Sequence, residues 1–210
     1  WEGLEQEFNF NAMVSQRGIL NLCHTDAQRD AYRRRGNAML LAGADAELLD
    51  SAQVRAMYPF LNFDDARFPI KGGLLQRRAG TARHDGVAWG YARGADMAGV
   101  DLIQNCEVTG FRMENGRVLG VETSRGYIAA GKVGVAVAGS SSRVMAGAGM
   151  RLPIESHVLQ AFVSEGLKPT IDGVITFGAG HFYISQSDKG GLVFGGDPDG
   201  YNSYGQRGNL

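Results

Sequence analysis

Cysteine, net charge and long apolar runs are all scarce in this sequence of 210 residues. Its two cysteines, Cys23 and Cys106, stand far apart and lack the paired spacing of metal ligands. This argues against a metal site or a disulfide framework and favours free thiols in a reducing compartment. The formal net charge of −1 gives no general attraction to nucleic acid or to an anionic membrane. Because no apolar run reaches the roughly 18 residues of a membrane span, we expect a cytoplasmic protein without metal, nucleic-acid or membrane partners.

Glycine, by contrast, is abundant. The sequence contains 31 glycines, about twice the number that an average usage of roughly 7% would give. This content is typical of a backbone that makes tight turns and approaches cofactors closely. The Gly-x-Gly-x-x-Gly fingerprint of dinucleotide-binding folds does not occur, however. Because the sequence starts at Trp1 and ends in a polar stretch, we expect an internal fragment of a longer protein, with that fingerprint upstream.

Capping and turn signals divide the first part of the sequence into helices and strands. Thr25 and Gln28 form a capping box that opens a helix to about Leu41, whose arginines form a charge-rich face. Asn115-Gly116 favours a type I′ turn between two strands. The other elements expected here are helices at 1–8 and 51–57 and strands at 14–22, 70–76, 105–113, 117–123 and 127–130.

Two further patterns follow. Residues 132–138 form an apolar run typical of a buried parallel strand, and Gly139 and Ser140 turn it into a helix. Such a turn offers backbone donors to an anionic cofactor group, although taken alone it is more often structural. After Pro153 the pattern predicts an antiparallel sheet, with strands at 156–165, 173–177, 181–186 and 191–195.

The main candidate for chemistry is His84. Thr81 is expected to cap a helix whose first three positions are Ala82, Arg83 and His84. The positive end of the helix dipole should favour a neutral imidazole, which is a usable nucleophile or ligand. Arg83 would add a fixed positive charge suited to a phosphate or a reduced flavin. For a lone histidine, packing or capping is the commoner role. The packed face of this helix is expected at Ala88, Tyr91, Ala92 and Ala95.

A family resemblance changes that balance. Residues 73–111 run from Gly-Leu-Leu-Gln-Arg-Arg-Ala-Gly-Thr-Ala-Arg-His-Asp through Val-Asp-Leu-Ile-Gln-Asn-Cys-Glu-Val-Thr-Gly-Phe. This stretch resembles the beta subunits of heterotetrameric sarcosine oxidases, within the superfamily of FAD-dependent amine and D-amino-acid oxidases. The likeness continues across nearly all of the chain.

The resemblance implies two interleaved domains. One is an FAD-binding domain of the glutathione-reductase-like type, without its N-terminal fingerprint, and the other is a substrate domain built on an antiparallel sheet. Residues 1–13 and 77–153 would belong to the FAD-binding domain. Residues 14–76 and 154–210 would belong to the substrate domain, the second of these segments being incomplete.

The resemblance also implies cofactor contacts. In that family a histidine in the Ala-Arg-His-Asp context carries a covalent FMN, and the matching residue here is His84, with Arg83 beside it. Val108 would approach the adenine of a noncovalent FAD, and Gly139 and Ser140 would pack against the flavin. Weaker candidates for the substrate site are His157, Gln160, His181, Tyr183 and Lys189.

The implied reaction is oxidative demethylation of sarcosine to glycine. Hydride would pass to FAD, and the electrons would pass to the FMN and then to oxygen, giving hydrogen peroxide. The expected partners are alpha, gamma and delta subunits, with tetrahydrofolate bound on the alpha subunit.

Two alternatives stay open. Another enzyme of the superfamily, such as a glycine oxidase or a dimethylglycine dehydrogenase, would not need a flavin on His84. A non-catalytic assembly subunit would keep the fold and contribute an interface, with Arg33, Arg34 and Arg35 as its docking face.

Overall fold

The chain folds into two compact units in a computed structural model, which describes residues 1–178, 180–196 and 204. The first unit comprises Trp1–Ala98 and the segment that begins at Leu159, and the second runs from Gly99 to Val158. Among the described residues, no helix is both long enough and apolar enough to cross a membrane.

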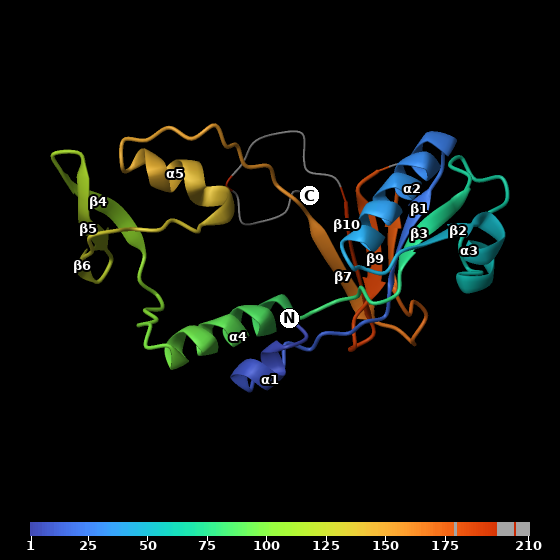
Figure 1. Cartoon of the computed structure of the whole chain (residues 1–210), viewed down its shortest axis with the longest axis horizontal. Coiled ribbons are helices and arrows are strands. Elements are labelled where there is room, and N and C mark those ends of the chain that lie inside the picture. Colours follow the sequence, from blue (N-terminus) through green and yellow to red (C-terminus); the bar gives the residue numbers. More distant parts are fainter. Residues whose placement is uncertain (179, 197–203, 205–210) are drawn as a thin grey trace. The chain divides into compact units, whose positions relative to one another are not determined.

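A mixed sheet forms the centre of the first unit (Figure 1). Its strands lie in the order β2-β3-β1-β8-β9-β10-β7. All neighbours in it are antiparallel except β1 and β8, which are parallel. These two strands come from distant segments of the chain. The strands are β1 Ile19–Cys23, β2 Glu47–Asp50, β3 Gly72–Gln76, β7 Ala161–Gly166, β8 Val174–Phe177, β9 Phe182–Gln186 and β10 Gly191–Gly195.

Three sequence expectations for this sheet need correction. The first strand starts at Ile19 and not at residue 14, because Gly18 has a φ of +89° that breaks the extended backbone. Strand β7 starts at Ala161 and not at 156. Strand β2 was not expected, since its four residues are too few to show an alternating pattern.

The hydrophobic core lies on one face of this sheet, under α3 (Ser51–Met57). Leu20 and Leu75 face each other across β1 and β3 and pack with Val54 of α3. Helix α2 (Asp26–Leu41) covers the other face, where Gly36 lies against the side chain of Leu74. Successive strand residues point to opposite faces, so the two helices sandwich β3.

Glycines attach α4 (His84–Met97) to α1 (Leu4–Phe8). A Cβ atom at Gly90 would come within 3.3 Å of Leu4, and one at Gly94 within 2.9 Å of the Phe8 ring. Only Ala92 and Ala95 of the expected packed face are half-buried. Tyr91 is 54% exposed, and Ala88 is also exposed, because side chains from α1 need the space that only glycine leaves.

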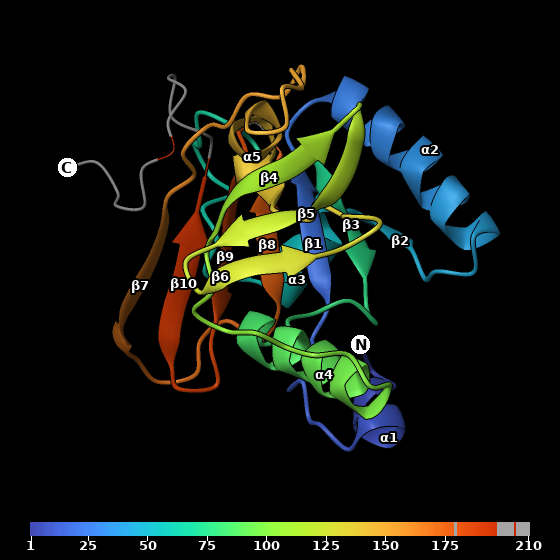
Figure 2. The same ribbon diagram turned by 90° about the vertical axis from the view of Figure 1, so that its left-hand side faces the viewer.

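The second unit contains a three-stranded antiparallel sheet, visible face-on in Figure 2. Its strands are β4 Val108–Glu114, β5 Arg117–Thr123 and β6 Gly126–Ala129. Asn115 and Gly116 have φ values of +50° and +75°, which confirms the type I′ turn. All three strands were expected within a few residues of these bounds.

The parallel strand expected at 132–138 is absent. Residues 132–137 have no regular structure, and the chain then enters a short 3₁₀ turn, η1 (Ala138–Ser140), and α5 (Ser141–Ala146). A strand needs a hydrogen-bonded neighbour, and none of the described strands pairs with this segment.

The compact units do not follow the predicted domain boundaries. Helix α4 begins within the segment predicted as 77–153, yet it belongs to the first unit because it packs on α1. The assignment of segments to an FAD-binding domain and a substrate domain stays a prediction.

We expect Leu20→Ala to lower the free energy of unfolding by about 2–5 kcal/mol, because it leaves a cavity under α3. Leu20 is fully buried, whereas Leu41 is 91% exposed, so Leu41→Ala should change this free energy by less than about 0.5 kcal/mol. Urea unfolding of both variants is the measurement, and equal losses would contradict the position of the core.

Candidate functional site

His84 is the first residue of α4 and is exposed. The helix starts two residues later than expected, and Thr81 is not its cap. The main chain of Thr81 pairs instead with Ser15, through Ser15 N–H to Thr81 O at 2.7 Å and Thr81 N–H to Ser15 O at 3.0 Å. Arg83 takes the capping position, and its N–H donates to Ala12 O at 3.2 Å. These contacts hold the residues before His84 to the segment that leads into β1.

Gly80 permits that approach. A Cβ atom at this position would lie 1.8 Å from the carbonyl oxygen of Ser15, which no other residue could tolerate without backbone movement. Gln16 adds a side-chain bond from Nε2 to Arg78 O at 2.8 Å. A surface groove runs alongside, lined in part by Val14, Gln16, Gly80, Thr81 and Ala82.

Arg83 is paired with Asp85. Its Nε and Nη2 donate to the two carboxylate oxygens at 3.1 and 2.6 Å, and Oδ1 of Asp85 also accepts the Gly86 N–H at 2.9 Å. Arg83, and to a lesser degree the Gly86 N–H, lower the pKa of the Asp85 carboxyl. The expected lone positive charge beside His84 is therefore half of an ion pair.

The imidazole of His84 makes no hydrogen bond to any described residue. Its charged neighbours Arg83 and Asp85 form an ion pair with each other, so neither of them bonds to the His84 ring. An exposed imidazole at the start of a helix is able to act as a nucleophile or a ligand.

The other predicted cofactor residues lie in the second unit. Val108 is the first residue of β4 and is 44% exposed. Gly139 and Ser140 belong to η1, where the Gly139 carbonyl accepts a hydrogen bond from the Ser156 hydroxyl. Because they occur in a 3₁₀ turn and not after a paired strand, they lack the geometry of a strand, turn and helix that the sequence predicted.

The predicted substrate residues are only partly brought together. Tyr183 lies on β9, opposite Thr176 of β8 and Gly195 of β10, and His181 directly precedes the strand. Tyr183 and the last residue of β9, Gln186, are about 10 Å apart along the strand, and Lys189 lies in the turn beyond Gln186. Gln160 precedes β7 in the first unit, and His157 lies in the second.

Sequence reasoning missed two polar residues near Tyr183. The Thr176 hydroxyl donates to Asn21 Oδ1 at 3.0 Å, and the Asn21 amide donates to Leu74 O. With Tyr183 they form a polar row across β1, β8 and β9. The signal was present in the sequence, since Asn21 interrupts the leucines of a buried strand.

The cysteines are free, as expected. Cys23 is buried and Cys106 half-buried, and burial raises the pKa of the Cys23 thiol. Among the described residues, no group of three or more His, Cys, Asp or Glu side chains could hold a metal ion.

Comparison with known families identifies the family to which the chain belongs. A family model described as FAD dependent oxidoreductase matches residues 1–209. The chain therefore belongs to the FAD-dependent oxidoreductases, and its mixed α/β fold agrees with that class.

Within the family, the chain is similar to subunits of one enzyme. It is 79% identical over 210 residues to the sarcosine oxidase subunit beta of Rhizobium meliloti (strain 1021) and 51% identical over 209 residues to that of Rhodobacter capsulatus. These matches cover 100% of this chain and 50% of each relative, so the chain spans about half the length of the curated relatives it matches.

Solved structures agree on the fold. L-proline dehydrogenase from P. horikoshii superposes with a TM-score of 0.84 at 25% identity, covering 98% of this chain and 54% of that one. Glycine oxidase from Geobacillus kaustophilus gives 0.74 at 19% identity, covering 99% and 54%.

We expect Gly80→Ala to destabilise the protein by about 1–3 kcal/mol, because the added methyl group must push Ser15 away. Gly3→Ala is the control, since a Cβ atom there meets nothing within 4 Å. Urea unfolding measures both, and a neutral Gly80→Ala would contradict the close approach.

The Arg83–Asp85 pair predicts a pH dependence. The pKa of Asp85 is lower in the folded chain than in the unfolded one, so the contribution of the pair is present above the unfolded value of about 3.9 and is lost as the pH falls through the folded pKa. Carboxyl-carbon NMR should find the Asp85 midpoint below about 3.9.

Arg83→Gln should raise that midpoint, whereas Arg34→Gln on α2 should leave it unchanged. If Arg83→Gln has no effect, the pairing is wrong.

Proposed function

We propose that this chain is part of the beta subunit of a sarcosine oxidase that oxidatively demethylates sarcosine to glycine. The 79% identity to a sarcosine oxidase subunit beta across the whole chain supports the assignment, together with membership of the FAD-dependent oxidoreductases. When bound, noncovalent FAD would accept hydride, and FMN attached to His84 would pass the electrons to oxygen, giving hydrogen peroxide.

The FMN proposal rests on one observation. The imidazole of His84, in the Ala-Arg-His-Asp context, is exposed and makes no hydrogen bond to any described residue. A ring nitrogen must be accessible and without a competing hydrogen bond to form a bond to carbon. The α4 N-terminus favours negative charge nearby, such as that of a reduced flavin. The contacts of Gly90 and Gly94 with α1 would hold the attachment point in place.

The other assignments follow from the family. The FAD-binding domain would be of the glutathione-reductase-like type, with Val108, Gly139 and Ser140 near the cofactor. The large sheet would cover the substrate. Tyr183 on β9 and His181, which directly precedes β9, are the candidate substrate residues that lie close together. His157 and Lys189 are the more weakly supported candidates.

Partners are also part of the proposal. The relatives carry the name subunit beta, which implies an oxidase of several subunits. We propose alpha, gamma and delta partners, tetrahydrofolate bound on the alpha subunit, and a cytoplasmic location.

A second candidate is an amine oxidase of the glycine oxidase type, favoured by the TM-score of 0.74. It would carry FAD but no flavin on His84. A non-catalytic assembly subunit has less support, because the chain belongs to the FAD-dependent oxidoreductases and is similar to subunits of an oxidase. A yellow complex that sarcosine bleaches would exclude that role.

We expect His84→Ala in the full-length protein, assembled with its partners, to abolish covalent flavin, because no other described group on α4 offers a free imidazole. Intact-mass analysis of the denatured subunit should show the mass of FMN added in the wild type and none in the variant. Flavin fluorescence of the denatured band should disappear in parallel.

Asp96→Asn on the same helix is the control and should retain the flavin, since it leaves the helix start unchanged. A wild-type subunit free of attached flavin would favour the glycine oxidase type.

A further inference from the structure

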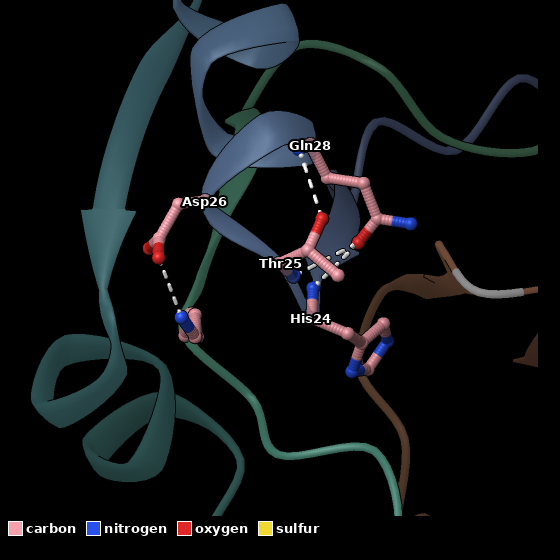
Figure 3. Close-up of polar contacts among 5 residues, drawn as sticks. His24, Thr25, Asp26 and Gln28 are labelled. Atoms are coloured by element: carbon pink, nitrogen blue, oxygen red, sulfur yellow. Dashed lines mark hydrogen bonds and ion pairs between the residues drawn. The ribbon is translucent and has the colours of Figure 1, made fainter.

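Gln28 has two roles in the structure. Its main-chain N–H donates to Thr25 Oγ1 at 3.1 Å, and its side-chain Oε1 accepts from the N–H groups of His24 and Thr25 at 2.7 and 3.2 Å. This is the capping box that starts α2 (Figure 3). The box uses only the oxygen of the carboxamide. The Nε2 group is left to bond elsewhere.

That Nε2 group donates to the carbonyl oxygen of Gly178 at 2.7 Å, across 150 residues of sequence. Gly178 directly follows β8 and is closely packed, since a Cβ atom there would lie 2.3 Å from Leu22 O and 3.2 Å from the Tyr32 hydroxyl. Gln28 therefore fixes a main-chain group at the point where β8 ends. We call this bond the Gln28 latch.

His24 also contacts the end of β8. The residue is 4% exposed, and its ring centroid lies 4.3 Å from that of Phe177, the last residue of β8. Nδ1 lies 3.2 and 3.3 Å from the carbonyl oxygens of Phe68 and Pro69, so the hydrogen belongs on Nδ1. Residues of the α2 start thus hold the end of β8 by one hydrogen bond and one ring contact.

Strand β9 depends on that end of β8. Phe177 pairs with Phe182 and Thr176 with Tyr183, so the first residues of β9 are placed by the last residues of β8. The Tyr183 side chain in turn lies against Gly195 of β10, where a Cβ atom would be 2.9 Å from its hydroxyl. A shift at Gly178 would therefore be passed through this pairing to Phe182 and Tyr183.

We propose that Gln28 is a positioning residue for the substrate side of the enzyme. The Gln28 latch holds β9, and with it Tyr183, in the position that an amine substrate meets. This inference rests on the proposed function, in which Tyr183 is a substrate-site residue. Gln28 itself does not touch the substrate.

The chain contains a matched control. Asp50 and Gln53 form the same capping box at the start of α3, with bonds of 2.8 Å in both directions, and no bond from the Gln53 Nε2 group is formed among the described residues. Glutamate serves as well as glutamine in a capping box. Gln28→Glu and Gln53→Glu therefore both keep a helix cap, and only Gln28→Glu loses the latch.

The test compares these variants in the assembled, full-length enzyme, alone and combined with Tyr183→Phe. Gln28→Glu should raise the KM for sarcosine about twofold to tenfold, the range for one lost hydrogen bond, with kcat and flavin content little changed. Gln53→Glu should match the wild type. In the Tyr183→Phe background the effect of Gln28→Glu should shrink, because the two residues act together. Amide hydrogen exchange in β9 should be faster in Gln28→Glu only.

Equal KM values and equal β9 exchange in the two glutamate variants would overturn the latch. Full additivity with Tyr183→Phe would show that Gln28 does not act through Tyr183. A wild-type enzyme that fails to oxidise sarcosine would instead count against the proposed function, and the exchange rates in β9 would still decide whether the latch exists.

Discussion

Strand β1 is the element on which the rest of the first unit depends. It pairs with β3 on one side and with β8 on the other, and β8 comes from a segment more than 150 residues away. Leu20 at its centre is fully buried. Each end of the strand leads to a proposed functional feature. The segment before Ile19 holds Thr81 and thereby the start of α4, while the residues after Cys23 form the Gln28 latch. Attachment of the flavin and placement of Tyr183 would thus share one support.

Local signals in the sequence predicted local structure well. The capping box of Thr25 and Gln28 and the turn at Asn115-Gly116 were found because their bonds lie within four residues of sequence. The strand expected at 132–138 failed because an apolar run becomes a strand only beside a neighbouring strand, and none is described for it. The start of α4 was misplaced because the main chain of Thr81, a good cap by composition, is engaged by Ser15 from a distant segment.

In the candidate site, too, local features could be predicted from the sequence and features that depend on distant segments could not. His84 was singled out from its residue context, and the structure places it exposed at the start of a helix, while its role stays a prediction. Two features depend on tertiary contacts and were invisible. One is the glycine face of α4, which only the position of Leu4 and Phe8 explains. The other is the bond from Gln28 to Gly178, because the carboxamide of a capping residue gives no sign that its nitrogen has a partner 150 residues away.

At the start of α4, the contacts that hold the helix in place do not involve the residue proposed for chemistry, His84. The Arg83–Asp85 pair is solvent-exposed, and solvent screening leaves such pairs with little effect on stability, so other contacts must hold the helix in place. That role falls to the contacts of Gly80 with Ser15 and of Gly90 and Gly94 with α1. These contacts involve the main chain before the helix and the glycine face of α4, and none of them uses the side chain of His84. A side chain that makes none of these contacts is available for chemistry, such as the flavin bond that we propose for His84.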